Sequence, residues 1–279
     1  MRRLFVLLLL AVVVALGVYA FWIEPRNVVL TRVEVPIAGL QRPVRALVIG
    51  DIQPAGPHET PAHIRAVIKR GMALRPDIVL LLGDYVTTRA LKTAFVDPVD
   101  TTAAMALLDA PMGVYAVLGN HDWWWDAPRM EALLAAAGIT VLRNRAVLAE
   151  ERGKALWIAG LEEYWTGNHD IAATLGQAGS DAPVILLSHN PDIFPEVPDR
   201  VGLTLAAHTH GGQVYIPFIG RPVVPSQYGE RFAYGLIEED GRTLYVTSGV
   251  GTAIIPVRFL TPPEIVLMTL IPRIGDKYP

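Results

Sequence analysis

The chain is poor in cysteine, in net charge and in histidine. It has no cysteine, so disulfides and thiolate metal sites are excluded, and the sequence suits an oxidising or a reducing compartment. The formal net charge is only −3, which leaves no basic stripe for a nucleic acid, and we expect no such partner. Only seven histidines occur in 279 residues, so the places where they gather are informative.

Apolar residues, in contrast, make up 52% of the chain, and glycine and proline are scattered through it. This composition is typical of a globular protein with a substantial core. The length suits one large α/β domain better than two small ones. We find no internal repeat and no second domain boundary.

The N-terminal segment is an uncharged apolar run, residues 4–23. As a helix it would span about 30 Å, the thickness of the hydrocarbon core of a bilayer. We predict a retained single-pass membrane anchor, with Tyr19 and Trp22 in the interfacial belt. A cleaved signal peptide with a small-residue site ending at Ala20 is the alternative.

Charges on either side of this run predict the orientation of the chain. Arg2, Arg3 and the amino terminus favour a cytoplasmic N-terminus, although three positive charges beyond the run reduce the bias: Arg26, Arg32 and Arg42. We therefore expect the rest of the chain outside the cytoplasm. The predicted organisation is a membrane anchor or uncleaved signal in residues 1–25, a linker and first strand in 26–42, and one domain in 43–279.

Beyond the anchor, apolar periodicity predicts strands alternating with helices early and strands dominating late. The predicted helices are 61–73, 101–108, 127–137 and 171–175. The predicted strands are 31–35, 44–49, 77–82, 113–118, 140–147, 155–159, 184–187, 203–206, 244–248, 253–258 and 264–270. The order favours an α/β fold in which a two-sheet β-sandwich is flanked by helices.

Polar motifs follow five of these apolar strands directly. They are Gly50-Asp51-Ile52-Gln53, Gly83-Asp84, Gly119-Asn120-His121-Asp122, Ser188-His189-Asn190 and His208-Thr209-His210. Four of the seven histidines lie in them. Because strand ends are where α/β folds collect their chemistry, this concentration indicates a metal site.

A hydrolytic centre with two cations about 3.5–4 Å apart needs a bridging carboxylate and several oxygen or imidazole ligands. Asp84 suits the bridge, because a carboxylate has two oxygens. The remaining ligands would come from Asp51, Asn120, His189, His208 and His210. Since His208 and His210 are two residues apart, both can point the same way.

These five motifs, in this order, closely resemble the calcineurin-like metallophosphoesterase superfamily. Its pattern runs Asp-x-His, Gly-Asp, Gly-Asn-His-Asp/Glu, a lone His, and Gly-His-x-His. The resemblance covers nearly all of the chain after the anchor and implies the fold of that superfamily. Three segments near the C-terminus resemble the membrane-associated branch: residues 247–252, 256–259 and 263–265.

The resemblance implies a role for each matching residue. Asp51 and His210 would hold one divalent metal ion, Asn120, His189 and His208 a second, and Asp84 would bridge them. His121 would stabilise the phosphoryl oxygen or protonate the leaving group, and Asp122 would fix its tautomer. We expect manganese to be preferred, with magnesium, iron or zinc as other occupants.

The sequence departs from this pattern at Gln53, where the family has histidine, and at Ala207, where it has glycine. A glutamine carbonyl is neutral, hard and weaker than imidazole toward softer cations. We therefore predict that Gln53 ligates the metal ion held by Asp51 and His210. This site should bind its ion more loosely and favour Mn²⁺ or Mg²⁺ over Zn²⁺. The alternative is that Gln53 points to solvent. Ala207 leaves the ligands intact.

Several other residues have two interpretations. The Trp123-Trp124-Trp125 run is either core packing or an apolar rim for an acyl chain or a membrane. Arg258 either approaches a phosphate oxygen or, as we favour, forms a structural salt bridge. We interpret His58, His63 and His169 as non-functional, and Glu162 and Glu163 as a solvated loop.

The sequence therefore predicts a membrane-anchored, dinuclear-metal phosphohydrolase that cleaves phosphodiester or pyrophosphate bonds. An anchored site favours an amphiphilic substrate, such as a phospholipid or a lipid-linked nucleotide sugar like UDP-diacylglucosamine. A UDP-linked substrate would require a cytoplasmic site, in tension with the predicted orientation. The alternatives are a degenerate metal-binding envelope or scaffold protein, and a phosphoprotein phosphatase.

Overall fold

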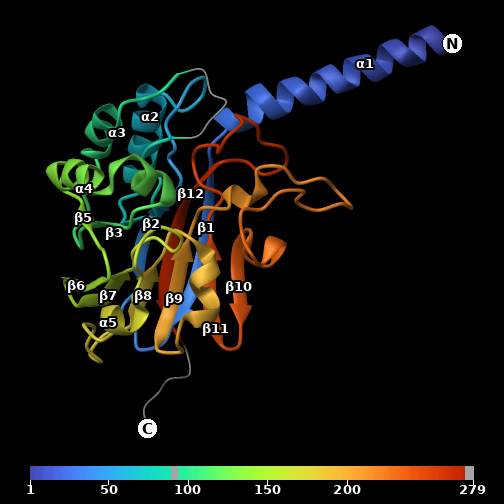
Figure 1. Cartoon of the computed structure of the whole chain (residues 1–279). Helices are drawn as coiled ribbons and strands as arrows, with labels where there is room; N and C mark the ends of the chain where they lie inside the picture. Colours follow the sequence, from blue (N-terminus) through green and yellow to red (C-terminus); the bar gives the residue numbers. More distant parts are fainter. Residues whose placement is uncertain (89–93, 274–279) are drawn as a thin grey trace.

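The computed structural model describes residues 1–88 and 94–273. Within these ranges, two six-stranded sheets lie against each other, helices cover their outer faces, and one long helix leaves the domain (Figure 1). The predicted two-sheet α/β architecture is confirmed.

The strands form two mixed sheets in which most neighbours are parallel. The first sheet has the order β1 (Val29–Ile37), β12 (Glu264–Pro272), β2 (Val44–Ile49), β3 (Ile78–Leu81), β4 (Val114–Ala116) and β5 (Thr140–Val141). The second has the order β10 (Gly235–Glu239), β11 (Arg242–Val246), β9 (Val201–Ala206), β8 (Val184–Leu187), β7 (Lys154–Gly160) and β6 (Arg145–Glu151).

Helices connect and cover the strands. The α-helices after the N-terminal one are α2 (Pro61–Met72), α3 (Pro98–Met105), α4 (Asn120–Ala136) and α5 (Ile171–Leu175). Short 3₁₀ turns follow as η3 (Pro191–Glu196), η4 (His210–Gly212) and η5 (Gly229–Phe232). Figure 1 shows α2, α3 and α4 together on the outer face of the first sheet.

Strand alternation explains how both faces of each sheet are buried. In β3, Ile78 and Leu80 pack in the core between the sheets, whereas Val79 and Leu81 pack under the helices. Successive side chains of a strand point to opposite faces, so a continuous apolar run is what a doubly covered strand requires. Each fully buried aliphatic side chain contributes about 1.5–3 kcal/mol to this packing.

Three predicted elements differ from the structure. Residues 253–258 form an irregular loop, so the predicted strand there is wrong; Pro256 and the buried Arg258 shape this segment instead. The predicted strand 140–147 is two strands, β5 and β6, because Asn144 between them adopts a φ of 49°. Helix α4 starts seven residues earlier than predicted, at Asn120, and is kinked at Asp126.

The N-terminal helix α1 (Arg2–Val18) continues through η1 (Tyr19–Ile23) and η2 (Glu24–Arg26). It is almost entirely exposed, and it is long and apolar enough to cross a membrane, a criterion that a secretion signal would also meet. The strand that follows, β1, pairs with β12 along its whole length, so the predicted linker segment contributes a strand to the first sheet.

Candidate metal centre

The five polar motifs meet at one end of the two sheets. Asp51 follows β2, Asp84 follows β3 and His189 follows β8, while the remaining motifs follow β4 and β9. Because these strands run parallel to their neighbours, their carboxyl ends lie at the same edge of each sheet. The edge brings together all seven predicted metal ligands through a continuous set of contacts.

The backbone at this edge is strained. A left-handed φ is uncommon in residues other than glycine, yet five predicted ligands adopt one: Asp51, Gln53, Asp84, His208 and His210. Each such residue costs about 1–3 kcal/mol, and strain of this kind gathers at functional sites. Close packing adds a further constraint, because a Cβ on Gly119 would lie 2.2 Å from Oδ1 of Asp84.

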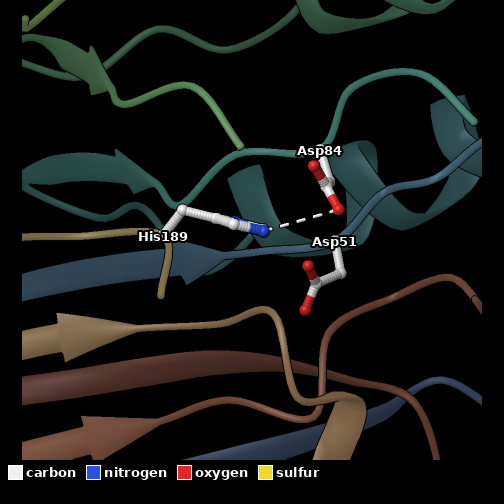
Figure 2. A group of neighbouring side chains, drawn as sticks. All are labelled: Asp51, Asp84 and His189. Atoms are coloured by element: carbon white, nitrogen blue, oxygen red, sulfur yellow. Dashed lines mark ion pairs between the residues drawn. The ribbon is translucent and has the colours of Figure 1, made fainter. Parts of the chain in front are cut away.

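Asp51, Asp84 and His189 form the centre of the cluster. Each offers one ligand atom, and these atoms lie within 4.8 Å of one another. All three side chains are buried. Figure 2 shows the ring of His189 directed at Asp84, with its Nε2 3.5 Å from Oδ2, and Asp51 beside them.

A second set of ligands gathers around His189. Its Nδ1 lies 2.7 Å from the carbonyl of Leu82, to which it donates, so Nε2 carries the lone pair in the neutral ring. That Nε2 is 3.0 Å from Oδ1 of Asn120 and 3.1 Å from Nδ1 of His208. Electron-pair donors that crowd at such distances require a proton or a cation between them, so the donor set fits a metal ion.

The remaining two predicted ligands flank the carboxylates. Nε2 of His210, at the start of η4, lies 3.9 Å from Oδ1 of Asp51. The amide nitrogen of Gln53 donates to Oδ2 of Asp84 at 2.7 Å, and the side chain is buried, so it does not point to solvent.

The cluster has a strongly negative potential. Burial opposes protonation of His189, but the charges of Asp84 and Asp51 and a hydrogen bond to Asp84 raise its pKa to about 10. Burial, helped by the charge of Asp84, raises the pKa of Asp51 to about 7. Burial also opposes ionisation of Asp84, but His189 and His121 outweigh it and lower that pKa. A site that holds a proton this firmly favours a cation in the same place.

We expect Gln53→His to change metal preference. An imidazole in place of the amide supplies a softer ligand, so half-maximal activity with Zn²⁺ should be reached at a lower concentration, and the advantage of Mn²⁺ should shrink. Gln53→Ala, which removes the bond to Asp84, should weaken metal affinity by about 10–100-fold. Metal titrations of both variants measure this, and unchanged affinities in both would show that Gln53 has no part in the site.

His121 lies at the cavity side of this cluster. The backbone amide of Thr88 donates to its Nδ1 at 3.1 Å, and Oγ1 of Thr88 is 3.0 Å from the same atom. Since Nδ1 accepts, the neutral ring carries its proton on Nε2. Thr88 gives no signal in the sequence, and only the fold brings it to His121.

The contacts of Asp122 differ from the expectation that it orients His121. Its carboxylate accepts hydrogen bonds from the backbone amides of Asp84, Tyr85 and Gly119 at 2.8–2.9 Å. It therefore joins the loop after β3 to the start of α4. Thr88, not Asp122, fixes the tautomer of His121 in the described contacts.

A cavity of about 520 Å³ opens beside the cluster. Its lining includes five predicted ligands, Gln53, Asp84, Asn120, His208 and His210, together with His121. The rest of its wall is mostly apolar and comes from three loops and α4: Trp124, Trp165, Val214, Pro222, Val223, Pro225, Ala253, Ile254, Ile255 and Val257. The cavity therefore combines metal-ligating side chains with a largely apolar wall.

Two of the three adjacent tryptophans pack against the core, and the third lines the cavity. Trp123 and Trp125 are partly buried against the core under the helices. Trp124 lines the cavity, with its ring 4.9 Å from that of His121. Trp165, for which the sequence pattern gives no signal, stands edge-on to His208, with 4.4 Å between the ring centroids. Its loop is held by Glu163, which is buried and accepts from Trp165 and Thr166, so the predicted solvated loop is wrong for this residue.

Arg258 forms no salt bridge in the described structure, so that prediction is wrong. It is fully buried, and burial lowers its pKa to about 10. Its guanidinium donates to backbone carbonyls of five residues: His210, Ser248, Gly249, Gly251 and Thr261. It thus ties the backbone of a predicted ligand, His210, to the loops after β11.

A buried group of carboxylate, amide and imidazole ligands beside a cavity defines a metal-dependent hydrolase. The sequence model described as calcineurin-like phosphoesterase matches residues 44–212. The uncharacterized metallophosphoesterase YkuE of Bacillus subtilis is 33% identical over 199 residues, which cover 70% of this chain and 68% of that protein.

Two relatives with more specific names also match. Phosphodiesterase YaeI of Escherichia coli is 31% identical over 214 residues, 75% of each chain. UDP-2,3-diacylglucosamine pyrophosphatase LpxG of Chlamydia trachomatis is 26% identical over 265 residues, covering 76% of this chain and 79% of that protein. The chain belongs to the calcineurin-like phosphoesterase family. It is a metal-dependent phosphoester hydrolase, of a family that uses a dinuclear metal site.

Proposed function

We propose that this chain is a membrane-anchored, dinuclear-metal phosphodiesterase or pyrophosphohydrolase acting on an amphiphilic substrate. The observation that carries this is the lining of the cavity, which combines predicted metal ligands with a largely apolar wall. A phosphate group fits the first environment and an acyl chain the second. The names of YaeI and LpxG support a diester or pyrophosphate bond, and that of LpxG supports a diacylated substrate.

The proposed organisation has an anchor in residues 1–25, a linker and first strand in 26–42 and the enzymatic domain in 43–279, whose last six residues lie outside the described range. Retention of the anchor is supported by contacts at its end. The carbonyl of Ala20 accepts from the amide of Arg258 at 2.9 Å, and Ala20 is itself buried. The charges of Arg2 and Arg3 favour an extracytoplasmic domain.

In this proposal Asp51 and His210 serve one metal, Asn120, His189 and His208 the other, and Asp84 both. Two divalent cations would polarise the phosphoryl group and activate water for in-line attack. The carboxylates, the amide of Asn120 and Gln53 favour manganese or magnesium, which prefer oxygen ligands. His121, with its proton on Nε2, would donate to a phosphoryl oxygen or to the leaving group.

A chromogenic phosphodiester tests the catalytic part of this proposal. We expect hydrolysis that needs added Mn²⁺ and stops when a chelator is present, and about two metal equivalents per chain by elemental analysis. A diacylated phosphodiester in mixed micelles should be cleaved more efficiently than the chromogenic one, because only its acyl chains would contact the apolar wall. One or no metal without turnover would favour the scaffold alternative, and cleavage of phosphopeptides alone would favour the phosphatase.

A further inference from the structure

Two apolar segments beside the cavity are exposed. Residues 214–220 and 253–257, which we name the apolar rim, contain no charged residue. Phe218 is fully exposed, Ile219 is 73% exposed and Ile254 57%. Soluble proteins rarely leave such apolar groups together in water, so a surface of this kind usually has a partner.

The rim is joined to the end of the N-terminal helix. The ring of Tyr19 packs edge-on against Phe259 at 6.1 Å, and both carboxylate oxygens of Glu24 accept backbone amides, from Leu260 at 2.9 Å and Thr261 at 2.7 Å. Glu24 is buried, which is unusual for an acidic residue and indicates a fixed connection. The chain that leaves α1 is therefore held directly beside residues 253–257.

Phe259 also holds the other part of the rim, residues 214–220. The amide of Phe259 donates to the carbonyl of Gln213 at 2.9 Å, and the amide of Tyr215 donates to the carbonyl of Phe259 at 2.8 Å. In Figure 1 the segment between η4 and η5, drawn in orange, extends away from the sheets on the side toward which α1 runs. This segment and α1 therefore project on the same side of the domain.

We propose that the apolar rim inserts into the interface of the bilayer that α1 crosses. This rests on the anchoring part of the proposed function, and it adds a second membrane contact made by the enzymatic domain itself. The occupant is lipid because the rim continues the apolar surface of the anchor helix and because aromatic and aliphatic side chains without charge suit the headgroup–acyl boundary. Ile254 and Ile255 belong both to the rim and to the cavity wall. A lipid-borne substrate would reach the cavity from the bilayer without crossing water.

The absence of cysteine allows a direct test in the full-length protein. Three single variants, Phe218→Cys, Leu10→Cys and Glu238→Cys, are each labelled with an environment-sensitive nitrobenzoxadiazole dye. Each labelled variant is reconstituted in phosphatidylcholine–phosphatidylglycerol vesicles. Leu10 is exposed on α1 and reports the anchor, whereas Glu238 is exposed on β10, away from α1, and is the control. Lipids with nitroxides at the interface serve as quenchers.

We expect the labels at positions 218 and 10 to shift to the blue and be quenched, and the label at 238 to remain as in water. A quenched label at 10 with a water-like label at 218 would overturn the rim proposal and leave anchoring intact. An unquenched label at 10 would overturn both. A blue shift at 218 without quenching would mean that protein, such as a second copy, covers the rim. Turnover of the chromogenic diester reports catalysis independently of all these outcomes.

Discussion

Asp84→Asn should lower kcat/KM for a chromogenic phosphodiester by roughly 10³-fold or more, because it removes the proposed bridging carboxylate. A loss of about 4 kcal/mol of transition-state stabilisation corresponds to that factor, and metal ions supply several kcal/mol of it in such centres. The substitution keeps the volume of the side chain, so the loss reports charge and ligand chemistry, not a cavity.

The contacts of Asp84 explain why an amide at this position cannot do the work of the carboxylate. Oδ1 accepts from the amide of His121 at 2.9 Å, while Oδ2 faces both Gln53 and His189. In Asp84→Asn the side-chain oxygen can still accept from the amide of His121. The side-chain nitrogen would then face the donating nitrogen of Gln53, and two donors cannot form a hydrogen bond. The substitution therefore removes the bridging carboxylate and also disrupts its hydrogen bond with Gln53.

The measurement pairs kinetics with elemental analysis of the purified variant. We expect metal content to fall from two equivalents to one or none. Asp77→Asn is a matched control, because Asp77 precedes β3 whereas Asp84 follows it. The carboxylate of Asp77 pairs with Lys154 at the start of β7, at the opposite end of the strands from the predicted ligands. Asp77→Asn should retain activity. If Asp84→Asn turned over the substrate as fast as the wild type, the proposed metal centre would be wrong.

The positions of the predicted ligands could be foreseen because they depend on local patterns. Each follows a short apolar run that reads as a buried strand, and parallel strands bring their carboxyl ends to one edge of a sheet. Asp51 and His189 are far apart in sequence, yet the same rule applies to both. The two-sheet fold follows from the same runs.

The parts that could not be foreseen depend on contacts between distant segments. Residues 253–258 have the composition of a strand, but Arg258 finds its partners among backbone carbonyls of other loops. The bond between Thr88 and His121, and the packing of Trp165 on His208, join residues that no periodicity links. Asp122 was expected to act on its neighbour, but the fold presents it with three backbone amides.

His121→Ala should lower kcat by about 10²–10⁴-fold while leaving metal content unchanged, because this residue is proposed to transfer or share a proton and not to bind metal. Its ring lines the cavity and its Nδ1 accepts from Thr88, so Nε2 is the nitrogen that carries the proton in the neutral ring. The backbone amide of His121 still supports Asp84 after the substitution. A loss of metal would therefore contradict the proposed role.

Substrates with different leaving groups distinguish the two possible roles of His121. If it protonates the leaving oxygen, the loss should be large for an alkyl leaving group and small for p-nitrophenolate, which departs without a proton. If it stabilises a phosphoryl oxygen, the loss should be similar for both. Thr88→Val, which removes one of the two contacts to Nδ1, should show the same pattern with a smaller loss, since the backbone amide still orients the ring. Because Thr88 acts only through the ring, adding Thr88→Val to His121→Ala should cost no further activity, and a further loss would mean that Thr88 contacts the substrate itself.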